Sequence, residues 1–272
     1  MRSSRRSIQR LCILKQMDVV ISDLDGTLLD HESYSFEEAR PALTLLNSKR
    51  IPLVYCTSKT RRESVHWRRL TENQHPFIVE NGGAIVIPPD YFGSTVPAAV
   101  QLGDSYADLV ACLKGAAAES GCRVRGFHDM TVDEVARACG LPAGFAVLAK
   151  DREFDEPFLI LDNSSAPALL AAIERKGKRW TRGGRFFHIL GANDKAAAVR
   201  ILLDIYRRSD TQVRSIGIGD GMNDAAFLNT VDVPVLIRTP WLHELQALVP
   251  RGIATTLPGP RGWNEAVTRL FA

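Results

Sequence analysis

The sequence predicts an α/β protein in which a parallel sheet, covered by helices on both faces, carries an inserted α+β domain. Strand candidates near the N-terminus are almost continuously apolar and alternate with helical stretches. The same alternation returns near the C-terminus, whereas the residues between these two parts lack it. Apolar strands that alternate with helices are typical of a parallel sheet buried on both faces.

The first part of the predicted sheet begins at Met17–Ser22, which reads as a fully buried strand. A helical stretch follows over Phe36–Lys49, and Ile51–Cys56 and Phe77–Val79 are the next two strand candidates. Short apolar runs bounded by polar or turn residues favour buried strands. Residues 17–85 therefore supply one half of the sheet.

The second part of the sheet follows an amphipathic helix near the C-terminus. Val199, Leu202, Leu203 and Tyr206 fall at helical spacing, and Val213–Ile218 is a strand candidate that leads into Gly219, Asp220 and Gly221. We expect this part to complete one core domain, made of residues 17–87 and 189–272.

Residues 88–188 are predicted to form the inserted α+β domain. Thr131 and Glu134 have the form of a capping box at a helix start. The expected helices are Tyr106–Ser120, Thr131–Cys139 and Pro167–Lys176, and the expected strands are Ala146–Ala149, Phe158–Leu161 and Phe186–Leu190.

Charge argues against a nucleic-acid partner. The chain has 34 basic and 31 acidic residues, and residues 1–16 hold five of the basic residues and no acid, which leaves the rest at −2. Nucleic-acid binding needs a basic surface on the fold itself. The leader lacks the apolar stretch of a secretory signal, so we expect either a disordered basic tail or a true start at Met17.

The cysteines indicate a reducing compartment. Cys12, Cys56, Cys112, Cys122 and Cys139 form an odd set without a C-x-x-C pair, which favours reduced thiols in the cytoplasm. No run of 18 apolar residues appears, so we expect no membrane span.

Charged and hydroxyl residues stand where predicted strands end. Asp23, Thr57 and Asp220 each follow a strand, and in an open parallel sheet ligands bind beyond these ends. A carboxylate there can attack phosphorus, which suits Asp23, and a second carboxylate two residues later, Asp25, can carry the proton.

These anions need cations. Asp220 and Asp224 offer oxygen ligands of the kind that Mg²⁺ prefers, and Lys195 at a helix start can supply a point charge to a phosphate. Each feature also has an ordinary structural explanation: a turn, a helix cap or a solvated lysine. Their joint occurrence at strand ends favours a catalytic site.

The segments Asp23–Leu28, Thr57, Lys195 and Gly219–Asp224 together resemble the four motifs of the haloacid dehalogenase (HAD) superfamily of phosphatases. The resemblance implies a Rossmann-like core with a cap domain inserted between the second and third motifs. It implies that Asp23 becomes an aspartyl phosphate, that Asp25 protonates the leaving alcohol and then activates water, and that Thr57 and Lys195 hold phosphate oxygens. Mg²⁺ would be held by Asp23, the backbone carbonyl of Asp25 and Asp220, with Asp224 at or just behind the metal.

Within this superfamily the cap resembles the mannosyl-3-phosphoglycerate phosphatases, which form mannosylglycerate, a compatible solute. The resemblance rests on residues 56–60, 80–83, 126–130, 152–158 and 183–188. Ser58 and Lys59 follow Thr57 where broader cap-bearing phosphatases carry Gly-Arg, and Ala196 follows Lys195 where glycine is commoner. Another sugar-phosphate phosphatase, for glucosyl-3-phosphoglycerate or a hexose phosphate, and a sugar-phosphate mutase are the alternatives.

Substrate-binding residues are predicted from the chemistry of a sugar linked to phosphoglycerate. Cationic groups suit the glycerate carboxylate, carboxylate and amide groups suit sugar hydroxyls, and arginine is the better bidentate partner. The predicted set is Ser58, Lys59, Glu80, Asn81, Arg152, Glu156, Arg185 and His188. A structural role is an open alternative for each, and the oligomeric state is left open.

Overall fold

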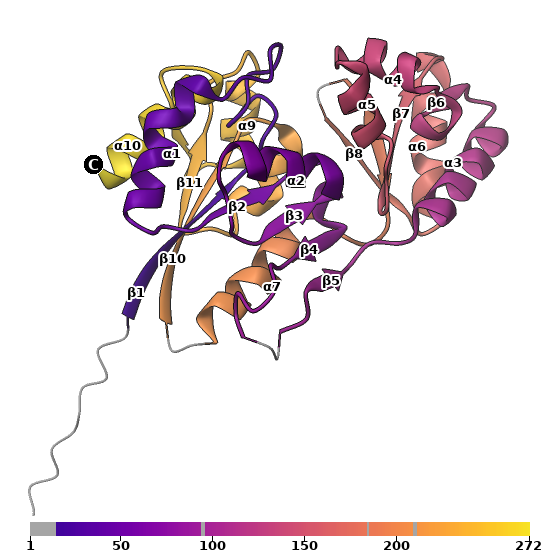
Figure 1. Ribbon diagram of the computed structural model, residues 1–272. Helices are drawn as coiled ribbons and strands as arrows, with labels where there is room; N and C mark the ends of the chain where they lie inside the picture. Colours follow the sequence, from indigo (N-terminus) through magenta and orange to yellow (C-terminus); the bar gives the residue numbers. More distant parts are fainter. Residues whose placement is uncertain (1–14, 94–95, 184, 209–210) are drawn as a thin grey trace, which may run out of the picture.

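The computed structural model describes residues 15–93, 96–183, 185–208 and 211–272. Figure 1 shows two bodies side by side, each built on its own sheet. The larger sheet has eight strands in the order β12-β11-β10-β1-β2-β3-β4-β5. These are β1 (Lys15–Ser22), β2 (Leu53–Cys56), β3 (Phe77–Val79), β4 (Ala84–Val86), β5 (Ala99–Gln101), β10 (Thr211–Gly219), β11 (Val233–Leu236) and β12 (Ile253–Ala254).

The larger sheet is parallel from β12 to β3, and β4 runs in the opposite direction, antiparallel to both of its neighbours β3 and β5. Successive residues of β1 alternate between two cores, because Val20 belongs to one hydrophobic cluster and Val19 and Ile21 to the other. Burial on both faces explains why the strand is apolar without alternation. The predicted parallel α/β core is confirmed.

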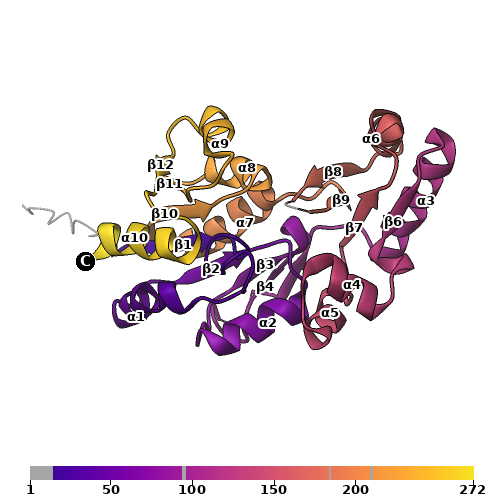
Figure 2. The same ribbon diagram turned by 90° about the horizontal axis from the view of Figure 1, so that it is seen from above.

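Helices cover both faces of this sheet (Figure 2). Trp263 and Leu46 lie in the cluster on one face, and Leu202 and Phe227 lie in the cluster on the other. The helices of this body are α1 (Arg40–Ser48), α2 (Arg61–Leu70), α7 (Lys195–Arg207), α8 (Ala225–Leu228), α9 (Leu242–Leu248) and α10 (Gly259–Phe271).

The smaller body is the cap, which in the described residues is an antiparallel sheet in the order β6-β7-β9-β8 with four α-helices. Its helices α3 and α6 pack on the sheet through Leu113, Ile173 and Phe158, and a separate cluster around Val135 joins α4 and α5. The elements are α3 (Tyr106–Ser120), β6 (Val124–Gly126), α4 (Val132–Cys139), α5 (Ala143–Ala149), β7 (Asp155–Ile160), α6 (Ala166–Arg175), β8 (Arg179–Arg182) and β9 (Phe187–Leu190).

One predicted element has the wrong type. The expected strand Ala146–Ala149 lies in helix α5, where Ala146 and Ala149 are both buried. Their spacing of three residues puts them on one helical face, and a short apolar run does not separate a strand from a helix by periodicity. The capping box at Thr131 and Glu134 forms as expected.

The change from one sheet to the other falls a little later than the expected domain division. Strand β5 still pairs with β4 in the larger sheet, although residues 88–188 were expected to be inserted. Strand β9 runs to Leu190 in the smaller sheet, past the expected boundary at 189. Of the expected tail, residues 1–14 lie outside the described residues, whereas Lys15 and Gln16 belong to β1 and pair with β10.

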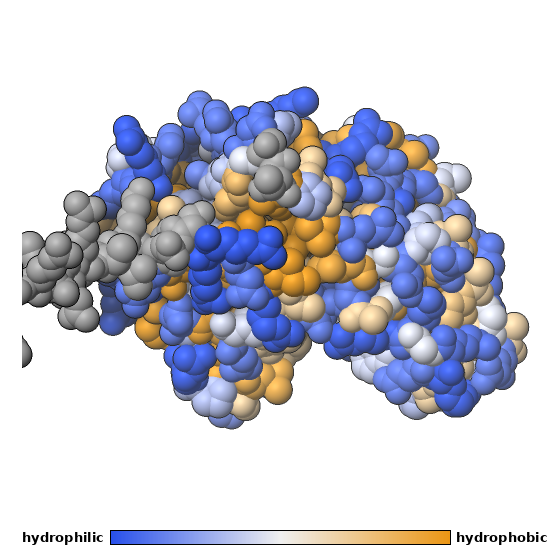
Figure 3. Space-filling model, turned by 90° about the horizontal axis from the view of Figure 1, so that it is seen from below, coloured by the Kyte–Doolittle hydropathy of each residue, from blue (hydrophilic) through white to orange (hydrophobic). Residues whose placement is uncertain are grey.

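Surface character differs between the two bodies. Figure 3 shows apolar side chains gathered on one face of the larger body, while the cap is mostly hydrophilic on the same side.

Among the helices of the described ranges, none is both long and apolar enough to cross a membrane. Cys56, Cys112, Cys122 and Cys139 carry free thiols.

Candidate active site

Three acidic side chains meet where the central strands of the larger sheet end. Asp23 directly follows β1 and Asp220 directly follows β10, and these strands are parallel neighbours. Asp224 reaches the same point from the turn before α8. One carboxylate oxygen from each residue lies within 4.8 Å of the others. The arrangement is a buried carboxylate cluster of the kind that binds a divalent cation.

Lys195 lies inside this cluster. Its Nζ donates to Asp23 Oδ1 and to Asp224 Oδ1, each at 2.7 Å, and its side chain is buried at the start of α7. Burial disfavours the charged amine, but the two carboxylates outweigh it and hold the pKa of Lys195 above its ordinary value. Lys195 therefore remains cationic beside Asp23.

The carboxylates are still in excess. Burial raises the pKa of Asp23 to about 7, although Lys195 acts in the opposite direction. Burial and the nearby Asp23 and Asp224 also raise the pKa of Asp220. Three buried carboxylates facing one lysine are stabilised by a further cation with oxygen ligands.

The glycine after Asp25 is required for this packing. Gly26 has φ +74°, and a Cβ at this position would lie 2.5 Å from Asp220 Oδ2. Thr27 Oγ1 donates to Asp220 Oδ1 at 3.1 Å, and Asp224 Oδ2 accepts from the backbone N–H groups of Asp220 and Gly221. The local sequence thus fixes the position of each carboxylate.

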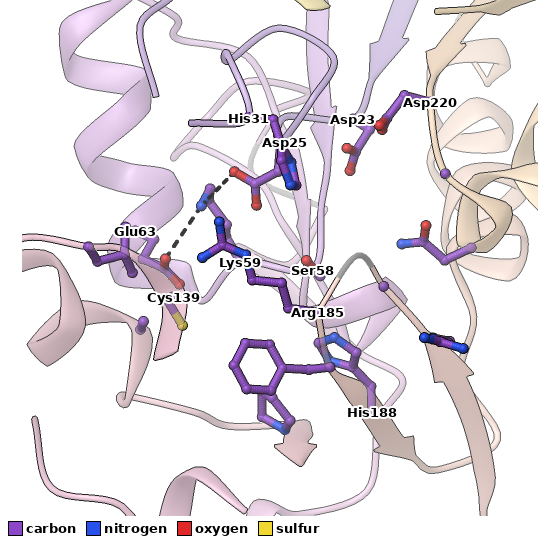
Figure 4. Close-up of a pocket in the computed structure, with 18 of the residues that line it drawn as sticks. Asp23, Asp25, His31, Ser58, Lys59, Glu63, Cys139, Arg185, His188 and Asp220 are labelled. Atoms are coloured by element: carbon purple, nitrogen blue, oxygen red, sulfur yellow. Dashed lines mark ion pairs between the residues drawn. The ribbon is translucent and has the colours of Figure 1, made fainter. Parts of the chain in front are cut away.

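Asp25 lies beside a second lysine. Lys59 Nζ is 2.9 Å from Asp25 Oδ1 and 3.7 Å from Glu63 Oε1, and it stands over the ring of Tyr34 (Figure 4). Burial opposes the charge of Lys59, but Asp25 and Glu63 raise its pKa above the ordinary value. Lys59 was predicted to bind a substrate carboxylate, and here it pairs with protein carboxylates at the cavity wall.

A cavity of about 510 Å³ borders the carboxylate cluster, with walls from both bodies (Figure 4). Many of the predicted site residues line it: Asp23, Asp25, Ser58, Lys59, Arg152, Arg185, His188 and Asp220. Thr57, Lys195 and Asp224 are buried behind the wall.

Three predicted substrate-binding residues do not line the cavity. The Glu80 carboxylate accepts hydrogen bonds from the backbone N–H groups of Glu153 and Phe154, and burial raises its pKa to about 8. The Asn81 amide donates to a cap carboxylate, and Glu156 is fully buried between cap side chains. These residues fasten the cap to the core or fill the cap interior.

Several residues that line the cavity were not predicted. His31 and Tyr34 follow the first motif, Arg182 precedes the Gly183–His188 stretch, and Trp241 donates from Nε1 to the carbonyl oxygen of Asp220 at 2.9 Å. The position of His31, Tyr34 and Arg182 beside recognised motifs was a usable signal. Nothing local marks Trp241, because only the fold brings it to Asp220.

Similar proteins place this chain in a known class. Residues 20–116 match the family described as haloacid dehalogenase-like hydrolase. A solved phosphatase of the haloalkanoate enzyme superfamily from Bacteroides thetaiotaomicron is 18% identical with a TM-score of 0.68, over 93% of this chain and 95% of that one. The fold is that of the haloacid dehalogenase-like hydrolases.

Curated relatives narrow the class. A protein of Methanococcoides burtonii named glucosyl-3-phosphoglycerate/mannosyl-3-phosphoglycerate phosphatase is 40% identical over 93% of this chain and 97% of its own length. A mannosyl-3-phosphoglycerate phosphatase of Pyrococcus furiosus is 37% identical over 80% of this chain and 90% of its own length. The chain belongs to this family of phosphatases.

Proposed function

We propose that the chain is a Mg²⁺-dependent phosphatase that hydrolyses mannosyl-3-phosphoglycerate to mannosylglycerate and phosphate, with glucosyl-3-phosphoglycerate as the alternative substrate. The observation that carries the proposal is Asp23, which Lys195 holds by a hydrogen bond and which lines a cavity that also contains arginines of the cap. The names of the relatives at 37–40% identity support the substrate class.

The carboxylate cluster fits the proposed metal. Asp23, Asp220 and Asp224 would hold Mg²⁺, with the backbone carbonyl of Asp25, because hard oxygen ligands at this density suit that ion. When bound, Mg²⁺ supplies positive charge that neutralises the transferring phosphoryl group.

Asp23 is the proposed nucleophile. Lys195 holds one of its oxygens at 2.7 Å, which fixes the carboxylate and stabilises negative charge at the reacting centre. Attack forms a bond from Asp23 to phosphorus and breaks the bond from phosphorus to the C3 oxygen of the glycerate. Asp25, which lines the same cavity, gives a proton to that oxygen.

The second step returns the site to its starting state. Asp25, now ionised beside Lys59, takes a proton from water, and the resulting hydroxide breaks the bond from Asp23 to phosphorus. Inorganic phosphate and free Asp23 are the products. Thr57, buried next to this point, is proposed to hold a phosphate oxygen together with Lys195.

The cap is proposed to recognise the sugar and the glycerate. Arg182 and Arg185 come from the β8 to β9 region and line the cavity, where a carboxylate can accept hydrogen bonds from a guanidinium. Arg152 already donates to the carbonyl oxygens of Ser58 and Ala149, so its part is to shape the wall. A cytoplasmic location is also proposed, supported by the free thiols of Cys56, Cys112, Cys122 and Cys139.

The proposal is tested by phosphorus-31 NMR of the purified chain with mannosyl-3-phosphoglycerate, glucosyl-3-phosphoglycerate, 3-phosphoglycerate and a hexose phosphate. We expect inorganic phosphate to accumulate from the two glycosylated compounds in the presence of Mg²⁺. Turnover of the hexose phosphate alone contradicts the substrate assignment. Movement of phosphate to another position of a sugar, without release, identifies a mutase.

A further inference from the structure

The cap contains a buried acid that pairs with a histidine of the cavity wall. Asp155 opens β7, is fully buried, and lies 2.8 Å and 3.0 Å through its two oxygens from His188 Nδ1 on the adjacent strand β9. Because the acceptor is a carboxylate, the imidazole donates its Nδ1 proton to it.

The core holds Asp155 in place from the other side. Asn81 Nδ2 donates to Asp155 Oδ2 at 2.6 Å, and the Asn81 backbone N–H donates to the Thr57 carbonyl oxygen at 3.0 Å. Asn81 adopts φ +54° within a short turn, which aims its amide at the cap. Burial would raise the pKa of Asp155, but His188 and Arg152 overcome this effect and lower it, so the carboxylate stays ionised.

The second ring nitrogen of His188, Nε2, lies at the cavity wall. His188 lines the cavity opposite Asp23 and Asp220 (Figure 4), and within the described residues no side chain or backbone group is hydrogen-bonded to its Nε2. A Cβ on Gly183, another residue of the cavity wall, would lie 3.3 Å from this Nε2. An imidazole with its proton on Nδ1 presents an acceptor lone pair at Nε2.

A second histidine of the cap provides a contrast. His128 Nδ1 lies 2.7 Å from Glu156 Oε1, but its Nε2 lies 2.8 Å from Asp129, so both ring nitrogens face protein carboxylates. Neither His128 nor Glu156 lines the cavity. The hydrogen bond between His128 and Glu156 lies in the interior of the cap, whereas the pair of Asp155 and His188 offers a ring nitrogen to a ligand.

We propose that Asp155 is a positioning residue that holds His188 with Nε2 toward the cavity, where this nitrogen accepts a hydrogen bond from a hydroxyl group of the substrate. Since the hydroxyl groups of the substrate belong to its sugar, the pair recognises the glycosyl part, and this assignment rests on the proposed function. Asp155 acts only through His188 and makes no contact with the reacting atoms.

The kinetic test compares Asp155→Asn, His188→Ala and their double variant, with Glu156→Gln as the matched control. Loss of one well-placed hydrogen bond predicts a rise in KM for mannosyl-3-phosphoglycerate of about ten-fold, with kcat changed less than about three-fold. The rise in KM should be about five-fold smaller for p-nitrophenyl phosphate, which has no sugar hydroxyl. The double variant should be no worse than His188→Ala, because Asp155 acts through that residue.

A spectroscopic test does not depend on the substrate. Long-range ¹H–¹⁵N NMR of the histidine rings, assigned with His188→Gln, should place the His188 proton on Nδ1 in the wild type and in Glu156→Gln, and lose that preference in Asp155→Asn. A proton on Nε2 in the wild type overturns the inference. An equal rise in KM for mannosyl-3-phosphoglycerate and for p-nitrophenyl phosphate in the variants overturns it as well. If the wild type hydrolyses only p-nitrophenyl phosphate, the proposed function fails, and the ring measurement still decides the role of Asp155.

Discussion

Replacing Lys195 with methionine removes the cation shared by two buried carboxylates. Its Nζ lies 2.7 Å from both Asp23 and Asp224, and the lysine is 2% exposed. Removing one partner of a buried ion pair costs about 3–5 kcal/mol, because the remaining charge stays desolvated. Methionine keeps the volume and the apolar stem of lysine, so the loss of stability measures the effect of removing the charge.

The expected loss is large enough to measure by thermal unfolding. In a chain of this size 1 kcal/mol shifts the melting temperature by about 2–4 °C, so Lys195→Met should melt about 6–20 °C below the wild type in metal-free buffer. Added Mg²⁺ should recover part of this shift, because a cation at the carboxylate cluster replaces the missing charge. The same variant should lose about 10³-fold in kcat, since Lys195 also stabilises charge at the reacting centre.

The control is Lys114→Met, which removes the same charge from an exposed position on α3. It should melt within about 2 °C of the wild type, as expected of a surface substitution. The reasoning is refuted if Lys195→Met melts as close to the wild type as this control does, or if it keeps more than a tenth of the wild-type kcat.

Three further predictions follow from the site. The Asp25→Asn variant should release a burst of about one nitrophenolate per chain from p-nitrophenyl phosphate and then turn over slowly. Nitrophenolate leaves without an acid, whereas hydrolysis of the aspartyl phosphate needs a base. Steady release without a burst would contradict the role of Asp25. Arg185→Ala should raise KM for mannosyl-3-phosphoglycerate by about 10-fold or more, because a charge-assisted hydrogen bond to the glycerate carboxylate is lost. An equal rise in KM for p-nitrophenyl phosphate would exclude this glycerate contact. The lowered pKa of Asp155 predicts stability that is present above the ordinary carboxyl pKa of about 4 and is lost as the pH falls through the folded pKa. The free energies of unfolding of the wild type and of Asp155→Asn, measured in urea from pH 7 to pH 3, should therefore converge at the acid end. A constant difference between them would contradict this prediction.

The core was predictable from the sequence because its signals are local. The continuous apolar run before Asp23 reflects a strand buried on both faces, and Gly26 is needed where the turn passes Asp220. Parallel strands bring their carboxyl ends to one edge of the sheet, so the strand pattern alone predicts that Asp23 and Asp220 lie together.

The cap was harder to predict because its contacts join segments far apart in the chain. Glu80 and Glu156 have the chemistry expected of sugar ligands, yet backbone N–H groups and cap side chains already satisfy them. Asp155 belonged to a recognised stretch, but its role depends on His188, 33 residues further on, and on Asn81 from the core. Such partners cannot be read from spacing in one sequence.

The central claim is that Asp23 becomes phosphorylated during turnover, and trapping that group tests it most directly. The Asp25→Asn variant, loaded with p-nitrophenyl phosphate and Mg²⁺, is quenched and reduced with borohydride, which converts an aspartyl phosphate to homoserine. Peptide mass spectrometry should then find homoserine at position 23 and nowhere else. An unmodified Asp23, in a sample that has released a stoichiometric burst of nitrophenolate, would contradict the account.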